Sequence, residues 1–294
     1  MEKMYFILRI SYYFLRNSVR KIKYLINKFF FALTSNEIKA GLEKIGLKRG
    51  MTVYVHSSMR SFGYVNGGSN SVINSILNLV GDEGTVVMPT FTHKTDVFDP
   101  ENTKSWTGVI SENLRMKENA VRSIHPTHSV TAFGLLAKKI TKDHEKSKAP
   151  FDEKSPFHKL ALEESYVLML GTENNSMIHY VQNKVEFPNL FLKEDYELKC
   201  KINDKIKIIK TKMHDPNGSI KYIYKGNVCT DVQFLVNMYK DRKFDENGYM
   251  KTVKIGNAVC HLINTQDFVR EATNYLANNI KKHKNEYKSL IKNG

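Results

Sequence analysis

Four polar segments follow apolar, strand-like stretches and hold the residues best suited to chemistry. They combine small hydroxyl residues, glycines and histidines. At a helix entrance such residues offer unpaired backbone N–H groups, which suit phosphate or carbonyl oxygens. Loops of this composition also often do no more than cap the helix, so both interpretations stay open. The segments are residues 56–68, 89–92, 122–129 and 171–179.

Histidines in these segments are the candidate acid–base groups. An imidazole has an unperturbed pKa of about 6.5 and can take a proton at cellular pH. His179 by itself is more typical of a packed or exposed helical histidine than of a base. The spacing of His125 and His128 could indicate a metal, but Pro126 lies between them and no third ligand follows at a recognisable spacing. We therefore predict no metal site.

The residues around the first two segments predict an α/β domain. A capped helix is expected from Ser35 to a stop at Gly46, followed by a β-branched and aromatic strand over residues 52–56. An apolar-periodic helix should begin at Ser69, and a short buried strand should cover residues 85–88. Such a βαβ succession builds parallel sheets, whose ligand crevices lie at the carboxyl ends of the strands.

The remaining chain continues this pattern as one domain. Residues 199–225 alternate isoleucine with lysine around Asp215-Pro-Asn-Gly218, which predicts a two-stranded hairpin with one wet face. Further helices are predicted over residues 111–119, 135–145, 177–185 and 265–281, and further strands over residues 130–133 and 166–170.

Charge and length restrict the class of protein. The 294 residues carry a net charge of +15, which would ordinarily indicate nucleic acid or an anionic membrane as partner. Most of that charge lies at the two ends, because residues 1–33 have a net charge of +6 and residues 281–294 one of +4, which leaves +5 between them. No RNA-binding motif or aromatic platform accompanies it, so we expect no nucleic-acid partner. Three cysteines without a C-x-x-C pair fit a reducing cytoplasm.

Residues 1–33 form a separate unit, a basic amphipathic helical extension before the domain of residues 34–294. Leu8, Leu15, Ile22 and Phe29 recur every seven residues, with arginines and lysines elsewhere on the same helical wheel. Charges interrupt every apolar run well short of the roughly 18–20 residues that a membrane span needs. Two alternatives remain: peripheral contact with the anionic inner face of the cell membrane, or packing on the body or on the second subunit of a homodimer.

The order of several uncommon strings resembles the aminoglycoside 3-N-acetyltransferase family over roughly residues 36–280. These strings are HSSMRSFGYVNGG at 56–68, GTVVMPTFT at 84–92, FDP at 98–100, RSIHPTHSV at 122–130 and SP at 155–156. The resemblance implies an α/β/α sandwich around a mixed, partly parallel sheet, here with the basic hairpin and the N-terminal helix added. It also implies transfer of an acetyl group from acetyl-coenzyme A to a sugar amine.

The same resemblance implies roles for individual residues. His179 matches the family's general base, which would take a proton from the amine before it attacks the thioester. The absence of a G-x-S-x-G elbow and of a cysteine beside His179 favours direct attack. Thr90, Gln182 and Glu186 are expected to contact the acceptor. The residues that resemble the coenzyme-binding walls are Ser57, Ser58, Ser61, Phe62, Gly63, His128, Ser129 and Val130.

Two departures from the family affect the expected acceptor. Many members carry Glu where this chain has Gln182, and Glu186 could replace that carboxylate only in part. The hairpin region is rich in lysine, and these side chains either form only a solvated face or disfavour a polycationic substrate. We therefore favour an amino sugar that carries phosphate, used in surface-glycan assembly. The alternatives are an antibiotic-modifying aminoglycoside acetyltransferase and, more remotely, a non-enzymatic membrane- or RNA-binding protein. The lysines are Lys199, Lys201, Lys205, Lys207, Lys210, Lys212, Lys221 and Lys225.

Overall fold

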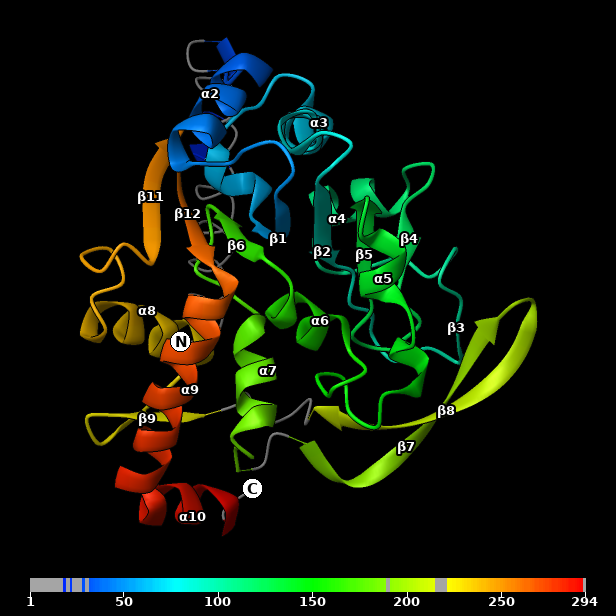
Figure 1. Cartoon of the computed structure of the whole chain (residues 1–294), viewed down its shortest axis with the longest axis vertical. Coiled ribbons are helices and arrows are strands. Elements are labelled where there is room, and N and C mark those ends of the chain that lie inside the picture. The colour runs from blue at the N-terminus through cyan, green and yellow to red at the C-terminus, as the bar shows by residue number, and fades with distance from the viewer. Residues whose placement is uncertain are drawn as a thin grey trace, which may run out of the picture.

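The computed structural model describes residues 18, 19, 22, 28 and 29, and then residues 32–188, 191–214 and 221–292. The amphipathic helix predicted over residues 1–33 therefore lies almost wholly outside the described residues. From Ser35 onward the chain forms an α/β domain with helices on both sides of a central sheet (Figure 1).

The central sheet has seven strands and is mixed. Its three middle strands, β6, β1 and β2, are parallel, and the strands on both sides of them pair antiparallel. Because β1 and β2 are joined through one helix, the predicted βαβ unit is confirmed. The strand order is β11 (Met250–Ile255), β12 (Ala258–Asn264), β6 (Ser165–Leu170), β1 (Thr52–Ser57), β2 (Thr85–Pro89), β5 (Val130–Gly134) and β4 (Val121–Arg122).

Alternation along the buried strands separates two hydrophobic cores. In β1, Val53 and Val55 pack with one core, whereas Tyr54 packs with the other. Helices α2 (Ser35–Ile45), α3 (Gly68–Val80) and α4 (Val109–Arg115) cover the first face. The other face is covered by α5 (Ala137–Thr141), α6 (Pro156–Leu162), α7 (Met177–Lys184), α8 (Asp231–Asp241) and α9 (Thr265–Lys282), and α10 (Lys284–Lys292) follows. The predicted α/β/α sandwich is thus confirmed.

Several helix ends differ from the predicted ones for local reasons. Thr34, not Ser35, caps α2, through a capping box with Glu37, and Gly46 ends the helix in a left-handed conformation as predicted. The helix predicted over residues 111–119 stops at Arg115, well before the positive φ of Asn119. The helix predicted over residues 135–145 is broken because Lys142 is extended, and a short 3₁₀ turn, η2 (His144–Lys146), follows.

The predicted hairpin exists, but its turn was misplaced. Strands β7 (Phe191–Ile202) and β8 (Lys205–His214) are joined at Asn203-Asp204, and residues 215–220 lie outside the described residues. Both turn residues have positive φ, as a type I′ turn requires, and asparagine and aspartate tolerate this conformation. The hairpin pairs through β7 with β3 (Val97–Phe98), and Figure 1 shows it extending away from the main sheet beside β3.

A second short hairpin, β9 (Tyr222–Tyr224) with β10 (Asn227–Cys229), leads directly into α8. Its inward-facing Tyr222 is fully buried and stacks on Phe234 of α8, with ring centroids 4.2 Å apart. This packing places the first turn of α8 beside α7, which is the arrangement that matters for the site.

Candidate active site

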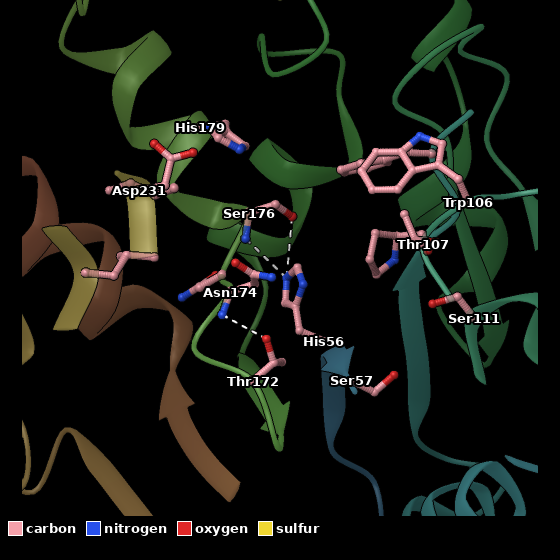
Figure 2. Close-up of a pocket in the computed structure, with 15 residues that line it drawn as sticks. His56, Ser57, Trp106, Thr107, Ser111, Thr172, Asn174, Ser176, His179 and Asp231 are labelled. Atoms are coloured by element: carbon pink, nitrogen blue, oxygen red, sulfur yellow. Dashed lines mark hydrogen bonds between the residues drawn. The ribbon is translucent and has the colours of Figure 1, made fainter. Parts of the chain in front are cut away.

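A pocket opens at the carboxyl ends of the three parallel strands. His56 and Ser57 end β1, Pro89 ends β2, and the loop after β6 contributes Thr172 and residues 174–176. A crevice at this edge of the sheet was predicted from the βαβ pattern. Figure 2 shows His179 and Asp231 on one side of the pocket and Trp106 and Thr107 on the opposite side. The remaining lining residues are Phe91, Ser111, Ile178 and Leu235.

His179 lies in the first turns of α7 and is held from behind by a buried amide. Its Nδ1 is 2.7 Å from the Oε1 of Gln182, and the Nε2 of Gln182 donates to the hydroxyl of Tyr222 at 2.5 Å. Gln182 and Tyr222 are both fully buried. An amide oxygen can only accept, so the proton of a neutral His179 is on Nδ1 and the basic lone pair is on Nε2.

Asp231 is one of the pocket residues that sequence reasoning missed, along with Trp106, Thr107, Ser111 and Leu235. It occupies the first turn of α8, whose N-terminus is fixed by a capping box between Thr230 and Gln233. Figure 2 shows its carboxylate next to His179. The pKa of Asp231 is raised above its usual value, because burial outweighs the charge of His179 and the Tyr222 hydroxyl, which both lower it.

One oxygen of Asp231 has no protein partner. The Oδ1 atom is buried and makes no hydrogen bond to any described residue. Unpaired buried polar atoms are costly, and in native proteins they often mark a site for a ligand, ion or water. The local signal available in the sequence, an aspartate after a helix-capping threonine, indicates only a helix start.

His56 is the second histidine of the pocket and is a poor base. The backbone N–H of Ser176 donates to its Nε2 at 3.2 Å, and the Ser176 hydroxyl lies 3.4 Å from the same nitrogen and 2.6 Å from the hydroxyl of Tyr54. Burial, followed by the nearby His179, lowers the pKa of His56 to about 3. His56 is therefore neutral at cellular pH, and its Nε2 is occupied as an acceptor.

The opposite wall is held by Arg122. Its guanidinium donates to the carbonyl oxygens of Thr103 at 2.5 Å and Thr90 at 2.7 Å and to the hydroxyl of Ser129 at 3.0 Å. Burial is the main effect that lowers the pKa of Arg122 to about 10. These contacts fix the segment that carries Trp106, so Arg122 acts on the pocket through the backbone.

Ser57 is the predicted coenzyme residue that lines the pocket, and its neighbours form the adjoining 3₁₀ turn η1 (Met59–Phe62). The Ser61 hydroxyl donates to Ser58 Oγ at 2.9 Å and to the carbonyl oxygen of Gly171 at 2.6 Å. Phe62 is buried in the core, and Gly63 ends the turn with a positive φ. Gly171 is itself tightly packed against Ser61, which ties this turn to the β6 loop.

The other predicted contacts lie behind or beside the pocket lining. Ser129 donates to the carbonyl oxygen of Thr90 at 2.8 Å, and the Thr90 hydroxyl is 3.2 Å from the Ser129 carbonyl, so each bonds to the other's backbone. Val130 is buried in β5. The His128 ring packs at a tilt against Phe91, with ring centroids 5.0 Å apart, and burial lowers the pKa of His128 well below the usual value. Glu186 is exposed after the end of α7, and Gln182 supports His179 from behind. Contacts of these residues with coenzyme or acceptor stay predictions.

A second cavity lies on the other side of the 172–174 loop. At about 340 Å³ it is larger than the first, at about 250 Å³, so size alone would choose it. Its charged side chains are partly paired with each other, because Glu173 bonds His261 at 3.1 Å and Lys243 bonds Glu246 at 2.8 Å. The first cavity combines a positioned imidazole with an unpaired carboxylate oxygen, and we assign the chemistry to it for that reason.

Within the described part of the chain, no three His, Cys, Asp or Glu side chains are grouped so that they could hold a metal ion. No helix in that part is both long enough and apolar enough to cross a membrane.

Comparison with known proteins decides the family. The family model for aminoglycoside 3-N-acetyltransferase matches residues 54–277, which include every pocket residue. The chain belongs to the aminoglycoside 3-N-acetyltransferase family. The predicted family is thereby confirmed, and so, at the level of this family, are an acyltransferase activity and acetyl-coenzyme A as the acyl donor.

Relatives of this aminoglycoside 3-N-acetyltransferase family member align over most of its length. It is 28% identical to the SPbeta prophage-derived aminoglycoside N(3')-acetyltransferase-like protein YokD of Bacillus subtilis, over 89% of this chain and 99% of that protein. It is 27% identical to aminoglycoside N(3)-acetyltransferase III of Salmonella sp, over 83% and 91%. The solved structure of AAC-IIIb, described as binary with CoASH, has the same fold, with a TM-score of 0.71 at 22% identity over 83% and 96% of the two chains.

Proposed function

We propose that this protein transfers the acetyl group of acetyl-coenzyme A to an amine of an aminoglycoside, with His179 as general base and Asp231 as the site for an ammonium group of the acceptor. The observation that carries the proposal is the side-by-side placement of His179 and the unpartnered Oδ1 of Asp231 in one pocket. The fold of a family member bound to CoASH supports the choice of donor.

The base is held ready by its hydrogen bonds. Because Gln182 accepts from Nδ1, the Nε2 of His179 is the nitrogen that takes a proton from the amine. The neutral amine nitrogen bonds to the thioester carbonyl carbon and passes its proton to His179 as that bond forms, and the coenzyme leaves as a thiolate that recovers this proton. This is direct attack, and it uses no covalent enzyme intermediate.

The buried side-chain NH2 group of Gln182 needs a hydrogen-bond acceptor, which a carboxylate at this position would not need. Its Nε2 donates to Tyr222, and the Tyr222 hydroxyl in turn interacts with Asp231. The carboxylate that the family often has after the histidine is thus replaced by a carboxylate from α8, linked to His179 through two neutral groups. Asp231 can also stabilise the imidazolium that forms when His179 takes the proton.

The charge of the pocket supports a cationic acceptor. Among the described residues that line it, Asp231 is the only acidic side chain, and none is lysine or arginine. The described lysines of the β7–β8 hairpin do not line it either. Both points favour the aminoglycoside alternative over the phosphate-bearing acceptor that the hairpin charge suggested, in agreement with the names of the relatives. A role in surface-glycan assembly stays a prediction.

The test is turnover of acetyl-coenzyme A with two acceptors, a kanamycin-type aminoglycoside and a nucleotide-linked amino sugar. We expect acetylation of the aminoglycoside and a fall in kcat of about 10²–10⁴-fold in His179→Gln. His158→Gln is the matched control, because His158 bonds Tyr180 at 3.1 Å outside the pocket lining. Turnover of the nucleotide-linked sugar alone, or full activity in His179→Gln, would overturn the proposal.

A further inference from the structure

His56 has a hydrogen-bonding arrangement that the proposed base mechanism does not use. It ends β1 beside Ser57, and its ring reaches from the strand toward Ser176 at the floor of the pocket (Figure 2). It is 7% exposed. A buried histidine at the carboxyl end of a central strand is well placed to meet the reacting group of a ligand in that crevice.

The proton of His56 is located by its partner. The Ser176 backbone N–H is a donor and cannot accept, so the Nε2 that it contacts at 3.2 Å carries a lone pair and no proton. The short contact between Tyr54 and Ser176 holds the Ser176 side chain in place beside the same ring. Burial disfavours the imidazolium form and lowers the pKa of His56, so the ring stays neutral.

A neutral imidazole with a lone pair on Nε2 must carry its proton on Nδ1. The Nδ1 atom of His56 has no hydrogen-bond partner among the described residues. This atom is also not completely buried. Nδ1–H is therefore a donor that is available to a group in the pocket. A donor of fixed orientation in a dry site is the feature that stabilises an oxyanion.

We propose that His56 is a catalytic residue of the acetyl transfer, and that its neutral Nδ1–H donates a hydrogen bond to the thioester carbonyl oxygen as negative charge develops there. This inference rests on the proposed function. When the amine nitrogen bonds to the carbonyl carbon, the C=O π pair moves onto the oxygen that His56 contacts. When the pair returns, the C–S bond breaks and the thiolate takes the proton that His179 removed. His56 itself keeps its proton throughout.

The two pocket histidines would then have complementary roles. His179 accepts a proton through Nε2, whereas His56 offers one through Nδ1 without giving it up. Neutrality suits the second role, because a donor that stays neutral does not release its proton to the oxyanion. Among the described residues, the titratable groups around His179 and His56 are Tyr54, Asp231, His128 and each other.

Two substitutions separate the two nitrogens of His56. An asparagine amide nitrogen falls near the position of Nδ1, so His56→Asn keeps a donor there. A glutamine side-chain oxygen falls near the position of Nε2, so His56→Gln keeps the acceptor for Ser176 and loses the Nδ1 donor. We expect kcat for acetyl-coenzyme A with a kanamycin-type aminoglycoside to fall about 10²-fold in His56→Gln and clearly less in His56→Asn. The Kd for coenzyme A should change less than about threefold in both.

The second measurement does not depend on activity. Nitrogen-15 NMR of histidine-labelled protein, with His56→Asn to assign the signal, should show His56 as the neutral Nδ1–H tautomer between pH 5 and 8. A His56 that titrates in this range, or that carries its proton on Nε2, overturns the inference, as does a His56→Gln variant with wild-type kcat. If the wild-type protein acetylates no amine, the proposed function fails, whereas the tautomer is still measured by NMR.

Discussion

Replacement of Asp231 by asparagine isolates the charge of the proposed ammonium site. The substitution keeps the size and one oxygen of the side chain and removes its negative charge. Asp231 lies in the first turn of α8, and its Oδ1 is the buried oxygen without a protein partner. If this oxygen receives an ammonium group of the acceptor, the variant loses a charge-assisted hydrogen bond and retains a neutral one.

The size of the effect follows from that difference. Hydrogen bonds to charged groups contribute about 1.5–3 kcal/mol, and neutral ones about 0.5–1.5 kcal/mol. The expected loss is therefore about 1–2 kcal/mol, or about 5–30-fold in kcat/KM for the aminoglycoside. The free energy of unfolding of Asp231→Asn should rise or stay the same. Burial raises the pKa of Asp231, so the folded protein binds a proton more readily than the unfolded chain, and the charged form costs stability at neutral pH.

The assay compares steady-state kinetics for both substrates with thermal unfolding. We expect the KM for the aminoglycoside to rise, the KM for acetyl-coenzyme A to stay within about twofold, and Tm not to fall. Asp241→Asn is the matched control, because Asp241 ends the same helix and bonds Tyr224 and Tyr275 outside the pocket. It makes the same change of charge, and we expect no effect on acceptor KM.

The reasoning is refuted if Asp231→Asn keeps the wild-type acceptor kcat/KM. It is also refuted if the two aspartate variants weaken the acceptor equally, since the effect would then come from net charge. A fall in Tm together with a loss of kcat for every acceptor would show that Asp231 supports the start of α8 and does not bind the ammonium group.

Three further outcomes are expected. Gln182→Glu should move the acid limb of the kcat/KM profile up by about one pH unit, because a carboxylate stabilises the adjacent imidazolium; a downward shift contradicts this. Tyr222→Phe should lower kcat about tenfold, with Tyr224→Phe in the same strand unaffected. His56 and His144, each with a pKa lowered to about 3 mainly by burial, stay neutral in the folded protein, whereas unfolded histidines bind protons below about pH 6.5. The free energy of unfolding, measured in urea, should therefore fall by about 2 kcal/mol per histidine from pH 7 to pH 5; a flat profile contradicts it.

Local features of the fold were predictable because they depend on neighbouring residues. Hydrophobic periodicity and terminating residues a few positions apart predict three of the elements. These are the strand at residues 52–56, the helix that follows the glycine-containing loop, and the short strand ending at Pro89. The crevice at the carboxyl ends of these strands follows from the βαβ pattern, and the family strings point to Ser57 and His179, which both line the pocket.

The hairpin shows the limit of local signals. Asp215-Pro-Asn-Gly218 has the stronger turn composition, yet the turn is at Asn203-Asp204. The register is set by burial of Leu198, Cys200 and Ile209 on the inner face, with Phe98 of another strand packed against it. The free energy that turn propensity contributes is small, and burial of one face of the hairpin fixes the strand register more strongly.

The amino-acid sequence alone determined the α/β pattern, the family and the identity of the candidate base. Hydrophobic periodicity, helix-capping residues and the characteristic strings all depend on residues that are close together in the sequence. Only the tertiary structure decided that Asp231 stands beside His179, that Gln182 is backed by Tyr222, and that Ser176 leaves the proton of His56 on Nδ1. These contacts join α7, α8, β9 and the end of β1, which are far apart along the chain. Their distances depend on strand order and on how two cores pack, and a carboxylate after a capping threonine has the same local sequence whether or not it faces a pocket.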